Sequence, residues 1–341
     1  MAPVGPGQEM SALTGKSIMV LMPADAGIYA EIRRNLEELG FRVNMVTGLP
    51  ERFRYRGLGQ RLCNLLHKAI GDRGYKRRLV QEQMSSQVDW SIDEAGRVDF
   101  TLVIRADCFT HAQLEKARRN SGRCYGYHWD GVSRFPGVAE RIRHFHRFYV
   151  FDPADARPAE GVDHADSFWF DRIAGDAATA EPDVDVYYVG TYDARAPFLL
   201  TTFERLRRQG QTVRAIIAGR NPGPRPHIAG VSFPEAGITY SENLDLLPSA
   251  RIILDVPHLD VHQGLSLRVF EALGAGKKLI TTNPQVLRCD FCHPDNVHLL
   301  TDDDEALARF LAAPAVPVAT DLRLRHGFSA WLRRVLESEG E

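Results

Sequence analysis

The stretch His262–Asn283, HQGLSLRVFEALGAGKKLITTN, decides the fold of this chain. It follows an apolar run, Ile252–Val256, which has the length and composition of a buried β-strand. A short polar loop then leads into apolar residues at helical spacing, and Gly274 lies where that helix should end. The next apolar run, Lys278–Thr281, begins a second strand. Strands that alternate with helices in this way predict a parallel sheet with helices packed on its faces.

The beginning of the expected helix carries groups that a nucleoside diphosphate needs. A helix N-terminus presents unpaired backbone N–H groups and a positive dipole end, which suit phosphate. Arg268 lies about one turn into the helix and can donate charge-assisted hydrogen bonds to phosphate. Glu271 follows on the same face, where its carboxylate could accept hydrogen bonds from two ribose hydroxyls. An ordinary α/β helix that ends at glycine has a similar composition, so both interpretations stay open.

A resemblance to the donor-site segment of GT-B glycosyltransferases favours the first interpretation. It is carried by Gly264–Leu265–Ser266, Arg268, Phe270–Gly274 and Gly276–Lys277. The segment is most similar to the bacterial group related to the spore-maturation CgeB-like proteins and to enzymes of surface-polysaccharide assembly. In that family the glutamate of this segment holds the donor ribose, and the resemblance implies this role for Glu271. The order of strands and helices extends the resemblance to most of the chain.

The domain organisation follows from length and from the order of the elements. A chain of 341 residues suits two domains of roughly 150 residues each. We expect a disordered tail at 1–16, an acceptor domain at 17–173 and a nucleotide-sugar donor domain at 184–320. Ala174–Asp185 is small, acidic and helix-poor, and is the expected linker. The resemblance implies that a final helix in 321–341 crosses back to the first domain. The predicted fold class is α/β, with two Rossmann-like doubly wound domains facing a cleft.

The individual elements are predicted from apolar runs and from helical spacing. The predicted strands are Ser17–Met22, Phe41–Val46, Val98–Ile104, Arg123–Tyr127, Phe148–Phe151, Ser167–Phe170, Val184–Val189, Thr212–Ala218, Ile252–Val256, Lys278–Thr281 and Val297–Leu300. The predicted helices, besides the one quoted above, are Ile28–Leu39, His111–Asn120, Val138–Phe145, Phe198–Arg208, Asp304–Leu311 and Leu322–Leu336.

Composition excludes several classes of protein. The formal net charge of −2 gives no reason to expect binding to nucleic acid. No stretch approaches 18 apolar residues, so no transmembrane helix is expected, and the N-terminus lacks the features of a signal peptide. The five cysteines form no even set of disulfides, which favours a reducing compartment. We therefore expect a cytoplasmic protein, with peripheral contact at the inner membrane face as an option.

Polar residues that follow two strands of the first half are candidates for a catalytic base. Asp107 follows Val98–Ile104, and His128 and Asp130 follow Arg123–Tyr127. Both strand ends belong to the edge where a doubly wound sheet places its ligands. Inverting glycosyl transfer needs a base such as aspartate or histidine for the acceptor hydroxyl. The segment around Asp130, YHWDGVSRFP, is also similar to a recurring feature of the CgeB-like group. Asp130 could equally cap a helix or bind a turn.

A basic region lies at 51–80. It holds nine Lys and Arg residues against two acids, with leucines at helical spacing. Such a region is most often a solvated helix face over a core stripe. It could also contact an anionic acceptor or a phospholipid surface.

The remaining candidates surround the expected donor site. By resemblance, the turn after Val184–Val189 faces the donor phosphates or the reacting sugar, whereas a plain βα turn would look the same. Tyr240 precedes an expected helix at a position that often contacts the nucleotide base in this fold. His262 lies on the loop where the donor sugar would sit. The donor-binding candidates are Gly190, Thr191, Arg195, Tyr240, His262, Gly264, Leu265, Ser266, Arg268 and Glu271.

No metal is expected. Asp302, Asp303 and Asp304 read like a metal-binding motif, but acids are normal at a helix N-terminus. Cys289 and Cys292 form a single CxxC pair, which lacks the second ligand pair of a zinc site. GT-B enzymes usually neutralise the leaving phosphate with a helix dipole and basic residues.

The sequence therefore predicts a glycosyltransferase that moves a sugar from a nucleotide-diphosphate donor to an acceptor hydroxyl. By resemblance the acceptor is a glycan, a lipid-linked sugar or a protein, in the assembly of surface polysaccharide or another glycoconjugate. A sugar-nucleotide epimerase of the same build and a non-catalytic nucleotide- or sugar-binding protein remain the alternatives. A nicotinamide-linked dehydrogenase is disfavoured because neither half has the glycine-rich fingerprint.

Overall fold

The computed structural model describes residues 13–47, 63, 67, 75–173, 182–219 and 225–337. These residues form two six-stranded sheets in which all neighbouring strands are parallel. The part of the chain that holds the first sheet is called the N-terminal domain below, and the part that holds the second sheet is called the C-terminal domain.

The N-terminal domain is built around strands in the order β2-β1-β3-β4-β5-β6. The strands are β1 (Ser17–Leu21), β2 (Arg42–Val46), β3 (Val98–Ile104), β4 (Ser121–His128), β5 (Arg147–Val150) and β6 (Val162–His164). Its α-helices are α2 (Ile28–Glu38), α4 (Tyr75–Ala95) and α5 (His111–Arg119). Its 3₁₀ helices are η1 (Asp25–Gly27), η2 (Ala106–Cys108), η3 (Val132–Arg134), η4 (Pro136–His144), η5 (Pro153–Asp155) and η6 (Pro158–Glu160).

The C-terminal domain has the strand order β12-β11-β10-β7-β8-β9. Its strands are β7 (Val184–Thr191), β8 (Val213–Ala218), β9 (Val231–Ser232), β10 (Ala250–Asp255), β11 (Lys278–Thr281) and β12 (Val297–Leu299). The helices that follow β7 are α7 (Ala196–Arg208), α8 (Tyr240–Leu246), η7 (Leu247–Ser249), α9 (Leu267–Gly274), η8 (Pro284–Arg288), α10 (Asp304–Ala312), α11 (Thr320–Arg325) and α12 (Phe328–Glu337).

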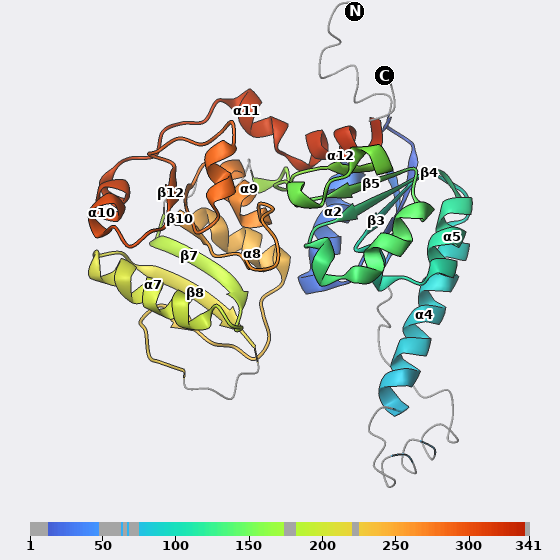
Figure 1. Cartoon of the computed structure of the whole chain (residues 1–341), viewed down its shortest axis with the longest axis horizontal. Helices are drawn as coiled ribbons and strands as arrows, with labels where there is room; N and C mark the ends of the chain where they lie inside the picture. Colours follow the sequence, from blue (N-terminus) through green and yellow to red (C-terminus); the bar gives the residue numbers. More distant parts are fainter. Residues whose placement is uncertain are drawn as a thin grey trace, which may run out of the picture.

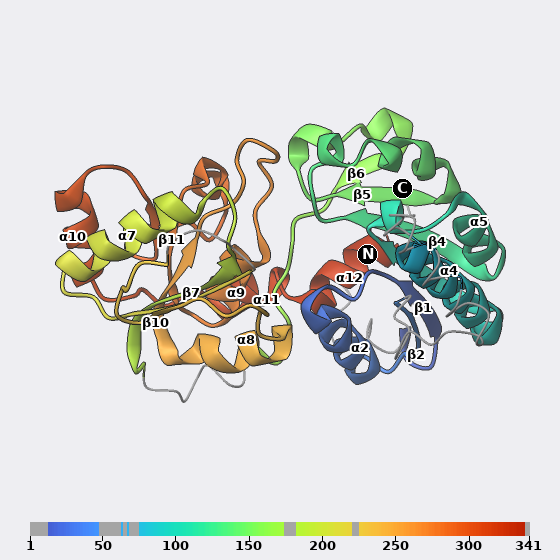
Figure 2. The same cartoon turned by 90° about the horizontal axis from the view of Figure 1, so that it is seen from below.

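The two domains lie side by side, and α11 and α12 run from the C-terminal domain back to the N-terminal domain (Figure 1, Figure 2). The last helix packs on the first sheet. The hydroxyl of Tyr125 donates to the carbonyl of Leu336 at 2.9 Å, and the hydroxyl of Tyr149 donates to that of Val335 at 3.2 Å. Trp331 packs edge-on against Tyr127 with a ring-centroid distance of 4.9 Å. The predicted fold class, two doubly wound domains, is confirmed.

Each sheet is covered on both faces, and one core is common to both domains. Apolar residues of α4 and α5 cover one face of the first sheet, and those of α7 and α10 cover one face of the second. The remaining faces share a single cluster that contains residues of α2, α9 and α12. Trp169 and Phe170 belong to this cluster and are fully buried. The domains therefore have a continuous apolar contact.

The strand orders fix where ligands can bind. In a doubly wound sheet, ligands bind at the carboxyl ends of the strands where the strand order reverses. That point lies between β1 and β3 in the N-terminal domain, and between β7 and β10 in the C-terminal domain. The loop around Ala26 follows β1, and Gly190 lies at the end of β7.

Five elements differ from the sequence prediction. Ser167–Phe170 forms no strand: its aromatic side chains are core residues of an extended segment, and only Trp169 makes a bridge, to Gly327. Leu322–Leu336 is two helices, α11 and α12; between them Gly327 forms a bridge with Trp169, and the Phe328 N–H donates to the Trp169 carbonyl at 2.8 Å. Val138–Phe145 lies within the 3₁₀ helix η4. The short strands β6 and β9 were missed because neither has an apolar run.

Three predictions fall mainly outside the described residues: the tail at 1–16, the basic region at 51–80 and the linker at Ala174–Asp185. Leu13 nevertheless lies in the core, ahead of the predicted domain start at Ser17.

Candidate active site

A pocket of about 550 Å³ lies at the strand reversal of the C-terminal domain. Five of the predicted donor-binding residues line it, which are Gly190, Thr191, Tyr240, Arg268 and Glu271. Ala26, from the loop after β1, lines it from the N-terminal domain. Its other walls come from Val189, Ala218, Gly219, Glu235, Gly237, Ile238, Thr239, Asn243 and Leu267. The pocket size falls within the usual range for a small-molecule site.

The first turn of α9 is left available at this pocket. Ser266 has the extended backbone of an N-cap residue, but no side chain among the described residues caps the helix. The Ser266 hydroxyl donates instead to the buried carboxylate of Asp255 at 2.7 Å. Asp255 also accepts a hydrogen bond from the hydroxyl of Thr281 at 2.8 Å. The backbone N–H groups at the start of α9 can therefore bind an anion.

Arg268 is fixed in position by the end of β7. Its guanidinium donates from Nε and Nη2 to the carbonyl of Val189, at 3.1 and 2.6 Å. Nη1 lies 3.8 Å from a carboxylate oxygen of Asp255, and the guanidinium lies over the ring of Tyr188 at 5.2 Å. These contacts leave the guanidinium ordered at the pocket wall before any ligand binds, which lowers the entropic cost of binding phosphate.

Glu271 is almost completely buried, at 2% exposure, and still faces the pocket. It accepts a hydrogen bond from the hydroxyl of Tyr240. Burial raises the pKa of Glu271, while Tyr240 and Arg268 act in the opposite direction. Asn243 lines the same pocket as Glu271, and its side chain accepts a hydrogen bond from the hydroxyl of Tyr187 at 3.1 Å. A carboxylate held this firmly is a preorganised acceptor for hydroxyl groups.

The glycine at the end of β7 is required by its surroundings. A β-carbon at position 190 would overlap the hydroxyl of Tyr188. Because residue 190 is a glycine, no side chain covers its backbone, and a ligand in the pocket can approach that backbone closely.

Arg195 does not line the pocket. Its guanidinium binds both carboxylate oxygens of Asp193, at 3.0 and 2.6 Å, and the carbonyl of Val256 at 2.6 Å. His258 lies 3.1 Å from the same carboxylate. Burial opposes ionisation of Asp193, but the hydrogen bonds from Arg195 prevail and lower the pKa of Asp193 to about 2. Asp193 and His258 escaped the sequence analysis, although an Asp and an Arg two residues apart are a recognisable turn pair.

The three candidates for the base gather around one arginine. Arg105 donates to both carboxylate oxygens of Asp107, each at 2.8 Å, and lies 4.0 Å from Asp130. His128 lies 3.8 Å from Asp107. Arg134 donates to Asp130 at 3.1 Å. Burial opposes ionisation of Asp107, but the hydrogen bonds and charge of Arg105 outweigh it, so the pKa of Asp107 is lowered. Asp107 is therefore a poor proton acceptor.

Arg105 itself has a left-handed backbone, with φ of 63°. Its guanidinium also lies 3.9 Å from the ring centre of Phe135. The sequence analysis did not find it, because no local signal marks a non-glycine residue with positive φ.

His128 makes stability depend on pH. It is fully buried, neither ring nitrogen has a hydrogen-bond partner among the described residues, and burial lowers the pKa of His128 to about 4. In the unfolded chain the pKa should be about 6.5, so the unfolded state binds more protons between pH 4 and 6.5. Stability is expected to rise by roughly 2 kcal/mol from pH 4.5 to pH 7, measured by urea unfolding. His128→Leu should remove this increment, and an unchanged pH slope in the variant would contradict it.

Contacts between the domains bring the turn that carries Asp130 and Gly131 against His262. A β-carbon at Gly131 would lie 2.5 Å from the carbonyl of Val261 and 3.3 Å from His262. Asp152 of the N-terminal domain accepts a hydrogen bond from the backbone N–H of Gln263 at 2.6 Å. The loop that leads into α9 is thus held against the N-terminal domain.

His262 and Gly264 pack against Phe151 of the N-terminal domain. The His262 ring packs edge-on against Phe151 at 4.9 Å, its Nδ1 is buried with no partner among the described residues, and burial lowers its pKa. A β-carbon at Gly264 would lie 2.5 Å from the same phenylalanine. Leu265 is buried. Gly264, Leu265 and Ser266 therefore shape the loop before α9, and none of them lines the pocket.

Two of the three acids considered as metal ligands, Asp303 and Asp304, have structural partners. Asp303 caps α10 by accepting from the N–H of Ala306 at 2.9 Å, and Asp304 pairs with Arg205 at 2.6 Å. Within the described residues, no three His, Cys, Asp or Glu side chains are placed to share a metal ion. The same part of the chain contains no helix with the length and apolarity needed to span a bilayer.

No family model matches this chain, and no curated protein matches it. Several solved structures, however, match this chain. UDP-GlcNAc 2-epimerase from Methanocaldococcus jannaschii is 10% identical, with a TM-score of 0.51, over 94% of this chain and 99% of that one. AviGT4, a glycosyltransferase involved in avilamycin A biosynthesis, is 15% identical, with a TM-score of 0.51, over 95% and 96%. The catalytic domain of starch synthase IV from Arabidopsis thaliana, bound to ADP and acarbose, is 8% identical, with a TM-score of 0.51, over 94% of each chain.

These similarities extend over nearly the whole chain and establish its fold. The chain has the GT-B fold, which glycosyltransferases and UDP-GlcNAc 2-epimerases share. At these identities the similarity shows the fold alone.

Proposed function

We propose that this protein is a glycosyltransferase that uses a nucleotide-diphosphate sugar. One observation carries the proposal: five residues predicted from sequence for donor binding line a single pocket at the strand reversal of the C-terminal domain. The chemistry of these residues fits a nucleoside diphosphate, and the motif around α9 resembles the CgeB-like and surface-polysaccharide group. The proposed setting is the assembly of surface polysaccharide or another glycoconjugate in the cytoplasm.

The donor would be held by α9 and the turn after β7. The carboxylate of Glu271 accepts hydrogen bonds from the ribose hydroxyls. The diphosphate lies at the start of α9, where Arg268 and the backbone N–H groups stabilise the negative charge that develops as the sugar leaves. Gly190 and Thr191 allow the backbone to approach the phosphates or the sugar. No step of this scheme requires a metal ion.

The acceptor would enter from the N-terminal domain. Asp130 is the proposed base for the acceptor hydroxyl, because the turn that carries it lies against His262. Its oxygens accept from the Gly131 N–H at 2.9 Å and from Arg134 at 3.1 Å, whereas Arg105 binds both oxygens of Asp107 and helps to lower the pKa of Asp107. His262 contacts the donor sugar or the leaving diphosphate. The basic region 51–80 would contact an anionic acceptor or a membrane surface, and the acceptor is a glycan, a lipid-linked sugar or a protein.

Thermal unfolding with UDP, GDP, CDP, ADP and TDP, alone and as their sugars, tests the donor site. A ligand at 100 times its Kd stabilises the folded state by about 2.7 kcal/mol, which should raise the melting temperature by about 5 °C. We expect one base to stabilise the wild type, and we expect the shift to disappear in Glu271→Ala because the ribose loses its acceptor.

Glu305→Ala is the matched control. Its carboxylate is 91% exposed on α10, away from the pocket, so this variant should respond to the nucleotide like the wild type. Absence of a shift with every diphosphate, or an equal shift in Glu271→Ala, would remove the proposed donor site.

An epimerase is the second candidate, because UDP-GlcNAc 2-epimerase matches this fold over the same length as the glycosyltransferases. Incubation of the nucleotide sugar without any acceptor separates the two. An epimerase converts the sugar under these conditions, whereas a transferase leaves its configuration unchanged. A non-catalytic binding protein would be stabilised by the nucleotide and turn over nothing, with or without acceptor.

A further inference from the structure

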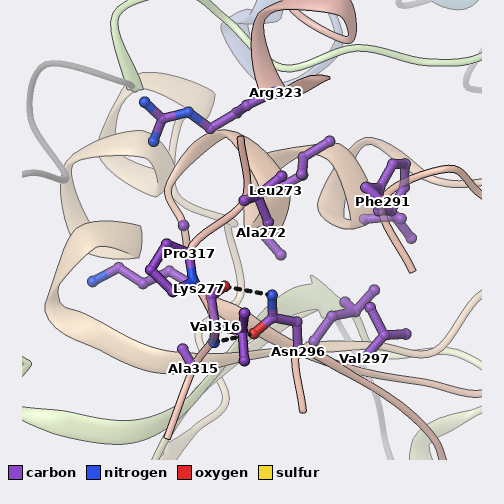
Figure 3. A pocket seen from close by; sticks show the side chains of 14 residues that line it. Ala272, Leu273, Lys277, Phe291, Asn296, Val297, Ala315, Val316, Pro317 and Arg323 are labelled. Atoms are coloured by element: carbon purple, nitrogen blue, oxygen red, sulfur yellow. Dashed lines mark hydrogen bonds between the residues drawn. The ribbon is translucent and has the colours of Figure 1, made fainter. Parts of the chain in front are cut away.

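A second pocket of about 330 Å³ lies beside α9 (Figure 3). Its lining residues of α9 lie on the opposite face of the helix from those of the donor pocket. The donor pocket contacts α9 through Leu267, Arg268 and Glu271, and the second pocket contacts it through Val269, Ala272 and Leu273. The two pockets share no lining residue. The second pocket is therefore a separate site.

The walls of the second pocket are mainly aliphatic. They are formed by Val269, Ala272, Leu273, Leu279, Phe291, Val297, Ala315, Val316, Pro317 and Val318. The segment that includes Val316 closes one side. It is held by the side chain of Asn296, which donates to the Val316 carbonyl at 2.7 Å and accepts from the Val316 N–H at 2.8 Å (Figure 3). The pocket is thus a preformed apolar cavity.

Two charged residues line the second pocket, and both are cations. Lys277 and Arg323 line the pocket, and no acid does. In the view of Figure 3 the charged ends of both side chains point to the same side, away from Phe291. Lys277 donates to the carbonyl of Pro248 at 2.6 Å.

Arg323 is the unexplained group. Its Nε is buried and has no hydrogen-bond partner among the described residues, where the guanidinium also makes no ion pair. A buried donor without a partner costs free energy, and a cation beside apolar walls attracts an anion. A ligand with an anionic head would supply what Arg323 lacks.

We propose that this pocket binds an amphipathic anion, an aliphatic chain that ends in a carboxylate. The chain occupies the space between α9 and the Val316 segment, and the carboxylate accepts hydrogen bonds from Arg323 and lies beside Lys277. The site is distinct from the donor pocket and its occupancy does not depend on the proposed transferase activity.

Titration calorimetry of the full chain with octanoate and with 1-octanol tests this site. Octanoate is expected to bind saturably at one site and more tightly than 1-octanol. Arg323→Gln should weaken octanoate roughly tenfold, because it removes a charge-assisted hydrogen bond, and should leave 1-octanol unchanged. Ala315→Trp should weaken both ligands by filling the pocket. Arg309→Gln is the control, since Arg309 is exposed on α10 and lies outside the lining.

Three results would overturn the proposal. They are the absence of saturable octanoate binding to the wild type, equal octanoate affinity in Arg323→Gln and wild type, and unchanged affinity for both ligands in Ala315→Trp. Circular dichroism and the melting temperature of each variant verify that it is folded. The rise in melting temperature with nucleotide is measured on the wild type and on Arg323→Gln. Because Arg323 does not line the donor pocket, this rise should be the same in both, and a failure at one site does not affect the result for the other.

Discussion

Asp130→Asn should lower the rate of sugar transfer by about 10² to 10⁴ while nucleotide binding stays within about twofold of the wild type. The amide keeps the shape of the side chain, and its one oxygen can accept from Arg134 or from the Gly131 N–H, but it cannot accept the proton of the acceptor hydroxyl. Asp130 is not among the residues that line the donor pocket, so its substitution should leave nucleotide binding intact. Single-turnover transfer rates and calorimetric nucleotide affinities, measured on the same preparations, give both quantities.

Asp163→Asn is the matched control for this experiment. Asp163 is also paired with an arginine, Arg147 at 2.9 Å, but it lies on β6 outside the cluster around Arg105. Its substitution should leave the transfer rate close to that of the wild type. A near-normal rate in Asp130→Asn would exclude Asp130 as the base and direct attention to His262 or His128.

Trp331→Ala should destabilise the protein by about 3 to 5 kcal/mol. The indole is fully buried and packs against Phe168 at 4.6 Å and Tyr127 at 4.9 Å. Its Nε1 has no hydrogen-bond partner among the described residues, so the loss is one of packing and of apolar burial. The midpoint and slope of urea unfolding measure the change in the free energy of unfolding.

Trp90→Ala provides the comparison, because Trp90 is 55% exposed on α4. That substitution should change the free energy of unfolding by no more than about 0.5 kcal/mol. A loss below about 1 kcal/mol in Trp331→Ala would mean that α12 is not docked on the first sheet in solution.

The elements around α9 were predictable because their signals are local. Periodic apolar residues, a glycine at the helix end and short flanking apolar runs define this helix and its two strands within a short stretch of sequence. The gathering of Asp107, His128 and Asp130 was also predictable, since parallel strands deliver their ends to one edge. What sequence could not supply was the distance between groups from different domains, such as Gly131 and His262.

The errors have physical causes. Ser167–Phe170 has the composition of a strand, yet its side chains are buried by α12 and by residues of both domains rather than by strand pairing. The role of Arg105 depends on a left-handed backbone that nothing in the sequence marks. Arg195 was predicted to face the donor phosphates or the reacting sugar; here it pairs with Asp193 outside the pocket lining, and its role in donor binding stays a prediction.

The position of α12 also affects how the protein is made. A ribosome produces the N-terminal sheet first, yet the helix that covers Tyr125, Tyr149 and Phe168 is synthesised only after all strands of the second sheet. The part of this sheet face that α12 covers, beside α2, therefore stays exposed while the second domain emerges. The nascent chain presents an aromatic surface during that time, which chaperones can bind. The second domain can bury both faces of its own sheet with its own helices, so the first domain is completed only after the second domain has emerged.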